Sequence, residues 1–199
     1  MTKRWISQRK QDGYYKLAKK AGYRSRSAYK LKQINDRYNV ISSGDTVVDL
    51  GCAPGGWLQV AWDIVGPGGT VLGVDIQRID NLEGVRFIRG DVTKTKTLEE
   101  ILSLISKADV VLSDMSPNIT GHYSMDHAKS VGLAESALEI AKKILREDGN
   151  FVVKVFQGDL FEDYFRTIKS NFSFTKAHSP KASRKQSSEI YIIAKGFKG

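Results

Sequence analysis

The sequence predicts an α/β fold in which a mostly parallel sheet is covered by helices on both faces. Short apolar runs alternate with segments of helical period along most of the chain, and this alternation is typical of parallel strands joined by helical crossovers. The last two runs are joined by the polar stretch 179–188, which has no room for a crossover helix. They are therefore expected to form an antiparallel hairpin at the C-terminal end of the sheet.

Each predicted element follows from its local pattern. Strands are expected where short apolar runs rich in β-branched and aromatic residues occur, at 46–50, 70–75, 85–88, 109–113, 151–156, 172–178 and 189–194. Helices are expected at 57–65, 98–106, 127–145 and 160–170. Ahead of the sheet, apolar residues recur at helical spacing within 25–38, at Ala28, Leu31, Ile34 and Tyr38.

The turn after the first predicted strand has the features of a nucleotide-binding loop. It contains Gly51, Gly55 and Gly56, and the next strand ends in Asp75. Glycines let a backbone approach a ligand closely, and a carboxylate in that place suits a ribose diol. The spacing G-x-x-x-G-G differs from the dinucleotide pattern G-x-G-x-x-G, so S-adenosylmethionine fits better than a hydride carrier. A tight turn without a ligand is the alternative.

Three acidic residues follow successive predicted strands. Asp75 ends the second strand, Asp91 comes shortly after the third, and Asp114 follows the fourth. Any one of them alone is more typical of a helix cap or turn. Since ligands in open α/β sheets bind beyond the carboxyl ends of the strands, three acids at equivalent positions indicate a pocket.

The positive charge is concentrated at the two ends of the chain. Residues 1–32 hold eleven Lys or Arg against one acid, and residues 166–199 hold eight against one. The middle, 33–165, has twelve basic and twenty acidic residues, although the whole chain has a net charge of +9. If the fold brings the two ends together, they form a cationic surface suited to RNA phosphates. A solubilising tail without a partner is the alternative.

Two charged residues in the predicted strands require an explanation. Lys154 lies between Val152 and Phe156 on one face of a strand, where a charge without a partner costs free energy. Lys154 could instead protect an edge strand, but a late strand in an alternating fold is more often interior. Glu189 opens the last apolar run, where an ion pair with a nearby lysine is an equally good interpretation. Lys30, taken alone, is typical of a surface lysine.

Together these residues resemble one enzyme family. The segment 49–57 reads Asp-Leu-Gly-x-Ala-Pro-Gly-Gly-Trp and the segment 113–118 reads Ser-Asp-Met-Ser-Pro-Asn. With Lys30, Lys154 and Glu189, they resemble the FtsJ/RrmJ family of RNA ribose 2′-O-methyltransferases. The resemblance runs from about residue 24 to 194 and includes the order and spacing of all the motifs.

The resemblance implies a Rossmann-like seven-stranded fold that uses S-adenosyl-L-methionine. It implies a catalytic tetrad at Lys30, Asp114, Lys154 and Glu189, and cofactor contacts at Gly55, Trp57, Asp75, Asp91 and Asp114. The most similar members are short, single-domain enzymes that methylate a uridine ribose in large-subunit ribosomal RNA. We therefore expect one methyltransferase domain over 1–199, with a basic RNA-binding segment at 1–23 and the catalytic core at 24–199.

The chemistry of a ribose hydroxyl gives these residues roles. The hydroxyl is a poor nucleophile, so it needs a base or a cation that stabilises the alkoxide. Our hypothesis is that Lys154 accepts the proton, Lys30 and Glu189 orient it and the ribose, and Asp114 links the tetrad to the cofactor. Methylation of transfer RNA or of a messenger cap is one alternative, and a non-catalytic RNA-binding assembly factor is another.

Composition also suggests the setting. One cysteine excludes a disulfide framework, and no apolar segment has the length of a signal core or membrane span. His122, His127 and His178 show no ligand spacing, so we predict no metal. We expect a cytoplasmic monomer that acts in ribosome biogenesis.

Overall fold

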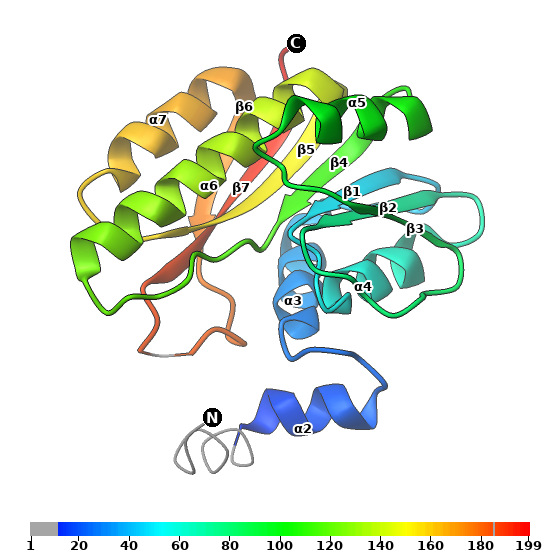
Figure 1. Cartoon of the computed structure of the whole chain (residues 1–199), viewed down its shortest axis with the longest axis horizontal. Coiled ribbons are helices and arrows are strands. Elements are labelled where there is room, and N and C mark those ends of the chain that lie inside the picture. Colours follow the sequence, from blue (N-terminus) through cyan, green and yellow to red (C-terminus); the bar gives the residue numbers. More distant parts are fainter. Residues whose placement is uncertain (1–11, 185) are drawn as a thin grey trace.

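The computed structural model describes residues 12–184 and 186–199, so residues 1–11 of the predicted RNA-binding segment lie outside the described part. Thirteen elements follow one another along the chain (Figure 1): α2 (Gly13–Lys20), α3 (Ala28–Tyr38), β1 (Thr46–Leu50), α4 (Gly56–Val65), β2 (Thr70–Asp75), β3 (Val85–Arg89), α5 (Thr95–Leu104), β4 (Ala108–Ser113), α6 (Tyr123–Ile144), β5 (Leu145–Phe156), α7 (Phe161–Asn171), β6 (Phe172–His178) and β7 (Glu189–Phe197).

The strands form a seven-stranded sheet in the order β3-β2-β1-β4-β5-β7-β6. β1 pairs in parallel with both β2 and β4, and β5 continues the parallel arrangement beside β4. β7 runs antiparallel to its neighbours β5 and β6. The predicted mostly parallel sheet with an antiparallel C-terminal hairpin is therefore confirmed.

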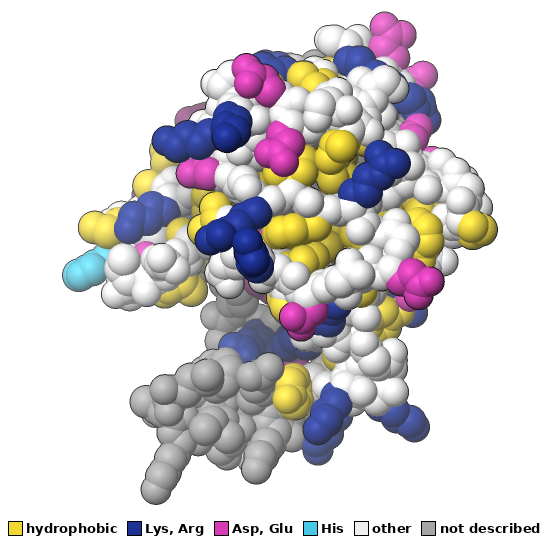
Figure 2. Space-filling view, turned by 45° about the vertical axis from the view of Figure 1, so that its right-hand side comes forward, with side chains coloured by type: hydrophobic (Ala, Val, Ile, Leu, Met, Phe, Trp, Pro, Cys, Tyr) yellow, Lys and Arg dark blue, Asp and Glu magenta, His cyan; other side chains and the backbone are white. Residues whose placement is uncertain are grey.

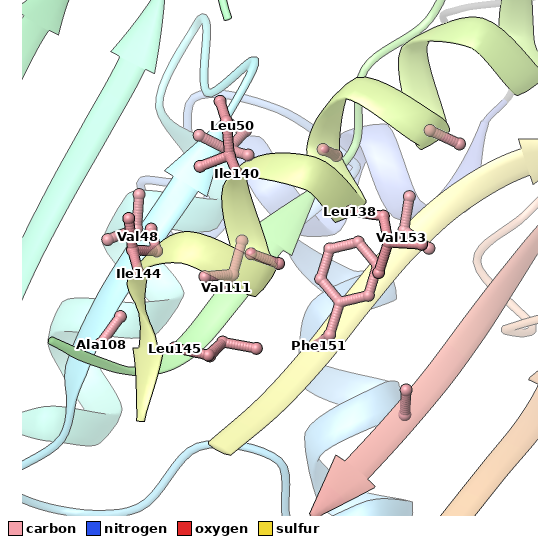
Figure 3. Close-up of a cluster of buried hydrophobic side chains, with 14 of the residues drawn as sticks. Val48, Leu50, Ala108, Val111, Leu138, Ile140, Ile144, Leu145, Phe151 and Val153 are labelled. Carbon is pink, nitrogen blue, oxygen red and sulfur yellow. The ribbon is translucent and has the colours of Figure 1, made fainter. Parts of the chain in front are cut away.

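Helices cover both faces of this sheet, as Figure 1 shows, with α3 and α4 on one face and α5, α6 and α7 on the other. Each face has its own apolar core. On the α6 side, Val48, Val111 and Phe151 of three adjacent strands pack against Leu138 and Ile144 (Figure 3). Burying these side chains on both faces supplies the main driving force for this arrangement.

Several element boundaries differ from those predicted. Helix α2 has no predicted counterpart, although Tyr14, Leu17 and Ala18 recur at helical spacing; its start is capped by Asp12, whose side chain accepts bonds from the N–H groups of Tyr14 and Tyr15. Helix α6 begins at Tyr123 rather than at 127, because residues 123–125 are exposed and show no apolar pattern of helical period. Strand β5 begins at Leu145, since that residue pairs with Ala108 across a register shift.

This topology brings the ends of distant strands to one edge of the sheet. The parallel strands β1, β2, β4 and β5 all end there. β7 begins at the same edge because it is antiparallel, and Glu189 pairs with Phe156 at the end of β5. Residues separated by more than a hundred positions in the sequence thereby come into reach of one another.

Candidate active site

The turn after β1 packs closely against neighbouring segments. Gly51 has a φ angle of +76°, which favours glycine, and a Cβ there would lie 2.2 Å from Cγ of Met115. The backbone N–H of Ala53 donates to Oδ2 of Asp75 at 2.8 Å, and the other carboxylate oxygen accepts from the backbone N–H of Gln77 at 2.8 Å. Asp75 therefore holds the glycine turn against the end of β2.

A cavity of about 350 Å³ opens beside this turn. Asp75, Asp91 and Asp114 all line it, as the sequence pattern predicted. Hydrogen bonds from the backbone N–H and the hydroxyl of Thr93 lower the pKa of Asp91, so this carboxylate stays ionised at neutral pH. The opposite wall includes Met115 and other apolar side chains.

The charge of the cavity selects the kind of ligand that fits. None of the described residues that line it is Lys or Arg, so a polyphosphate group would be repelled by the carboxylates. S-adenosylmethionine carries a sulfonium, an ammonium and a ribose diol, all of which suit carboxylate partners. The residues present therefore fit this cofactor better than a dinucleotide.

Asp49 adds a fourth carboxyl, which sequence reasoning included only as part of a motif. It is fully buried in β1, and neither of its oxygens has a hydrogen-bond partner among the described residues. Burial, with smaller effects from the charges of Asp114 and Asp75, raises the pKa of Asp49 well above its usual value. A cationic ligand group nearby would offset this cost, which again favours a sulfonium or ammonium.

Gly55 and Trp57, two predicted cofactor contacts, do not line the larger cavity. The Trp57 indole is buried; its N–H donates to the backbone oxygen of Ser27 at 2.8 Å, and its ring lies 5.8 Å from that of Tyr191. Trp57 and Asp49 line a smaller cavity of about 30 Å³ beside the turn. The structure thus gives Trp57 a packing contact, and its cofactor contact stays a prediction.

The four residues of the predicted tetrad converge at the edge of the cavity. Lys154 Nζ lies 2.9 Å from Oδ1 of Asp114 and donates to the backbone oxygen of the same residue at 2.7 Å. Lys30 Nζ lies 2.5 Å from Oε1 of Glu189. Both lysines are only 7% exposed, so each ammonium depends on its acidic partner. Lys30 is therefore not a surface lysine.

Tyr191 joins these two ion pairs, and sequence reasoning missed it. Its hydroxyl donates to Oδ1 of Asp114 at 2.6 Å and accepts from Lys30 Nζ at 3.1 Å. It is fully buried and stands opposite Lys154 in the β5–β7 pairing. The sequence held one signal for Tyr191. It is the one residue with a polar group in the apolar run 190–194, and it lies two residues from Glu189, on the same face of the strand.

The network determines which of its acids are charged. Burial alone would raise the pKa of Asp114, but the charges of Lys154 and Lys30 and the Tyr191 hydroxyl outweigh it, so the pKa is lowered. Burial, together with the charges of Asp114 and Glu189, raises the pKa of Tyr191 well above its usual value. At neutral pH Asp114 is a carboxylate, and Tyr191 is a neutral hydroxyl that can donate.

The arrangement can manage a proton beside a cationic cofactor. Lys154 is held by one residue, Asp114, which also lines the cavity. In the described part of the chain, no cluster of three His, Cys, Asp or Glu side chains could hold a metal ion. The side chains of the tetrad and Tyr191 are the titratable groups that hydrogen bonds and ion pairs join at this edge.

Comparisons with known proteins agree with this site. The FtsJ-like methyltransferase family matches residues 23–197 of this chain. Ribosomal RNA large subunit methyltransferase E of Methanosarcina mazei is 58% identical over 190 residues, covering 94% of this chain and 70% of that protein. The protein of the same name from Methanocaldococcus jannaschii is 51% identical over 203 residues, covering 99% and 83%.

Solved structures match the fold as well. A Plasmodium falciparum protein described as a ribosomal RNA methyltransferase has a TM-score of 0.80 at 27% identity, covering 89% of this chain and all of that chain. The Methanococcus jannaschii fibrillarin pre-rRNA processing protein has a TM-score of 0.58 at 14% identity, covering 80% and 70%, which shows the fold alone. The Rossmann-like fold expected from the sequence is confirmed. Because the family match over residues 23–197 includes the glycine turn and the four elements that carry the tetrad, α3, β4, β5 and β7, this chain belongs to the FtsJ-like methyltransferase family.

Proposed function

We propose that this chain transfers a methyl group from S-adenosylmethionine to a ribose 2′-hydroxyl in RNA, with a uridine of large-subunit ribosomal RNA as its target. The convergence of Lys30, Asp114, Lys154 and Glu189 beside an acidic cavity is the observation that carries the proposal. The relatives named ribosomal RNA large subunit methyltransferase E support the choice of ribosomal RNA.

The acidic cavity is our proposed cofactor site. Asp75 and Asp91 would hold the adenosine part, while Asp114 and the nearby Asp49 would face the cationic groups. When bound, S-adenosylmethionine supplies a methyl group already activated by the sulfonium. We retain Gly55 and Trp57 as predicted contacts, on the strength of the family resemblance.

The protein must position and deprotonate the ribose hydroxyl. We assign the ribose proton to Lys154 Nζ, which accepts it as a free amine once its own ammonium proton has passed to solvent. The contacts of Lys154 with Asp114 hold it beside the cofactor cavity, which Asp114 lines. Glu189 contacts Lys30, and no contact between Glu189 and Lys154 is present among the described residues. Glu189 would therefore orient the ribose together with Lys30, while Tyr191 couples that pair to Asp114.

The two basic ends of the chain meet and are our proposed RNA-binding surface. Arg26 pairs with Asp12 and also donates to the backbone oxygen of Ala182, which joins the start of the described chain to the 180–184 loop. A cavity of about 450 Å³ between them is lined by Lys19, Arg24, Arg26 and Arg184. Figure 2 shows Lys and Arg side chains around the lower part of the molecule, where α2 lies.

Reversing two exposed charges on this surface tests it. We expect the double variant Lys19→Glu with Arg184→Glu to weaken RNA binding at least about tenfold at about 0.1 M salt. The slope of the logarithm of the binding constant against the logarithm of the salt concentration should become shallower by about 1.4, the sum for two lost phosphate contacts. Cofactor affinity should not change. Filter binding over a salt series measures both effects.

The matched control reverses Lys142 and Lys143, which are exposed in the last turn of α6, away from α2 in Figure 1. An equal loss of RNA affinity in this control would show that the effect is one of net charge and not of a defined surface.

The reaction itself is tested with S-adenosylmethionine labelled on its methyl group. Incubation with total RNA should label large-subunit ribosomal RNA, and nuclease digestion should release a 2′-O-methyluridine. Label in transfer RNA or in a messenger cap would show that the proposed RNA target is wrong and that the proposed reaction is right. Absence of label from every RNA would leave the non-catalytic assembly factor as the surviving function.

The setting of the protein was predicted from composition. Within the described residues, no helix is both long and apolar enough to cross a membrane. The cytoplasmic location, the monomeric state, the single domain over 1–199 and the lack of a metal stay predictions.

A further inference from the structure

A further cavity, of about 300 Å³, adjoins the tetrad on the side of α6. Three of the four segments that carry the tetrad also contribute to its wall. The loop after Asp114 continues to Ile119, β5 runs from Lys154 to Phe156, and Ser188 precedes Glu189; Ile119, Phe156 and Ser188 all line this cavity. Whatever occupies it is therefore within reach of a ribose held at the tetrad.

The lining of this cavity is partly aromatic and apolar and partly polar. Tyr123, His127, Phe156 and Ile119 form the first part, and Gln186, Ser187 and Ser188 form the second. Asp126 is the one charged residue among its described lining residues, and its oxygens already accept bonds from the Thr120 and Gly121 backbone N–H groups and the Thr120 hydroxyl. Because none of the described lining residues is Lys or Arg, the cavity suits an uncharged flat ring with polar edge groups and not a phosphate.

Tyr123 presents an exposed aromatic ring in a fixed orientation. It is 62% exposed, yet its hydroxyl donates to the backbone oxygen of Gln157 at 3.1 Å. Its ring stacks on His127, with 6.2 Å between centroids and 12° between planes. An exposed ring held at both its edge and one face is pre-organised for stacking against a further ring.

His127 contributes a polar group without a partner. It is only 4% exposed, and its Nε2 accepts from the backbone N–H of Leu160 at 3.0 Å, so in the neutral ring Nδ1 carries the hydrogen. Nδ1 has no hydrogen-bond partner among the described residues. The backbone of Gly158 packs over the same ring, because a Cβ there would lie 2.7 Å from it. A buried donor without a partner among the described residues points to a ligand with an acceptor.

We propose that this cavity binds the nucleobase of the target nucleotide, stacked on Tyr123 and hydrogen-bonded by a ring carbonyl or ring nitrogen to Nδ1–H of His127. The inference rests on the proposed function, since it assumes that the ribose of that nucleotide lies at the tetrad. A base bound here has been drawn out of its stack, and its sugar is thereby directed toward Lys154.

A double-mutant cycle between protein and RNA tests the proposal. One partner is Tyr123→Ala, and the other is an oligonucleotide in which the mapped target nucleotide keeps its ribose but lacks its base. With intact RNA, Tyr123→Ala should raise KM for RNA between about 5-fold and 150-fold, the range for loss of one stacked base. With the abasic RNA, the same substitution should have almost no further effect, because the base it contacts is already absent.

Matched variants separate stacking from folding. Tyr123→Phe keeps the ring and should stay close to wild type, whereas Phe174→Ala removes another exposed aromatic ring, 45% exposed on the edge strand β6, and should leave KM unchanged. Cofactor affinity and kcat at saturating RNA should be the same in all of them.

Three results would overturn the inference while the proposed function stands. The first is an unchanged KM in Tyr123→Ala. The second is an equal increase of KM by Tyr123→Ala with intact and with abasic RNA. The third is an effect of Tyr123→Ala that disappears when a neighbouring nucleotide, and not the target, lacks its base. If wild-type protein methylates no RNA, the proposed function fails. The inference is then judged by RNA affinity alone, and equal affinity of wild type and Tyr123→Ala would overturn it too.

Discussion

Replacing Lys154 with Ala is expected to slow methyl transfer by about 10²-fold to 10⁴-fold, the usual contribution of a positioned acid–base group. Lys154 is the lysine whose partner, Asp114, also lines the cofactor cavity. Cofactor affinity should stay nearly unchanged, because the carboxylates that line the cavity remain. Single-turnover assays with labelled cofactor measure the rate, and calorimetry measures the affinity.

Two further variants make this result specific. Lys154→Arg keeps a positive charge beside Asp114 but cannot accept a proton at neutral pH, so it should be as slow as the Ala variant if Lys154 is the base. An active Arg variant would assign Lys154 to alkoxide stabilisation instead. Lys195→Ala is the control, since the hydrogen bonds of that ammonium within the described part of the chain go to the backbone oxygens of Tyr38 and Asn39, away from the tetrad. Retained turnover in Lys154→Ala would contradict the assignment altogether.

Most of the sheet could be predicted because its strands are local patterns. The apolar runs that became β1, β2 and β4 are buried on both faces, so most residues in them are apolar. The acids at the ends of these runs could be recognised because an acidic residue directly after an apolar run interrupts the pattern. Helix α2 escaped prediction because its stability rests on a cap and on contacts with distant segments.

The connections within the site could not be predicted, because they depend on register. Tyr191 looks like one more apolar residue of β7 until the antiparallel pairing sets it opposite Lys154. The family resemblance pointed to Lys30, yet only the packing of α3 against the sheet shows that it pairs with Glu189. Nδ1 of His127, which has no hydrogen-bond partner among the described residues, likewise has no signature in the sequence, because the contact of Leu160 with the other ring nitrogen arises only in the folded chain.

Asp114→Asn is expected to lower the free energy of unfolding by about 3–5 kcal/mol at neutral pH, the usual cost of removing one partner of a buried ion pair. It leaves the ammonium of Lys154 buried without its counter-charge. The folded pKa of Asp114 lies below its unfolded value, so its stabilising effect is present above the unfolded pKa of about 3.9 and is lost as the pH falls through the folded value. The difference between wild type and variant should therefore shrink in acid.

Asp49→Asn should have the opposite effect, although it is the same substitution near the end of the neighbouring strand β1. Unlike Asp114, Asp49 has no hydrogen-bond partner among the described residues. The folded pKa of Asp49 is raised, so wild-type stability is fully present below about pH 3.9 and falls as the pH rises through the folded value. Without this cost, the Asn variant should be more stable than wild type at neutral pH and should bind the cationic cofactor less well. Urea unfolding at about pH 3 and about pH 7 compares the two variants, and shifts of the same sign would show that the charge states assigned to Asp49 and Asp114 are wrong.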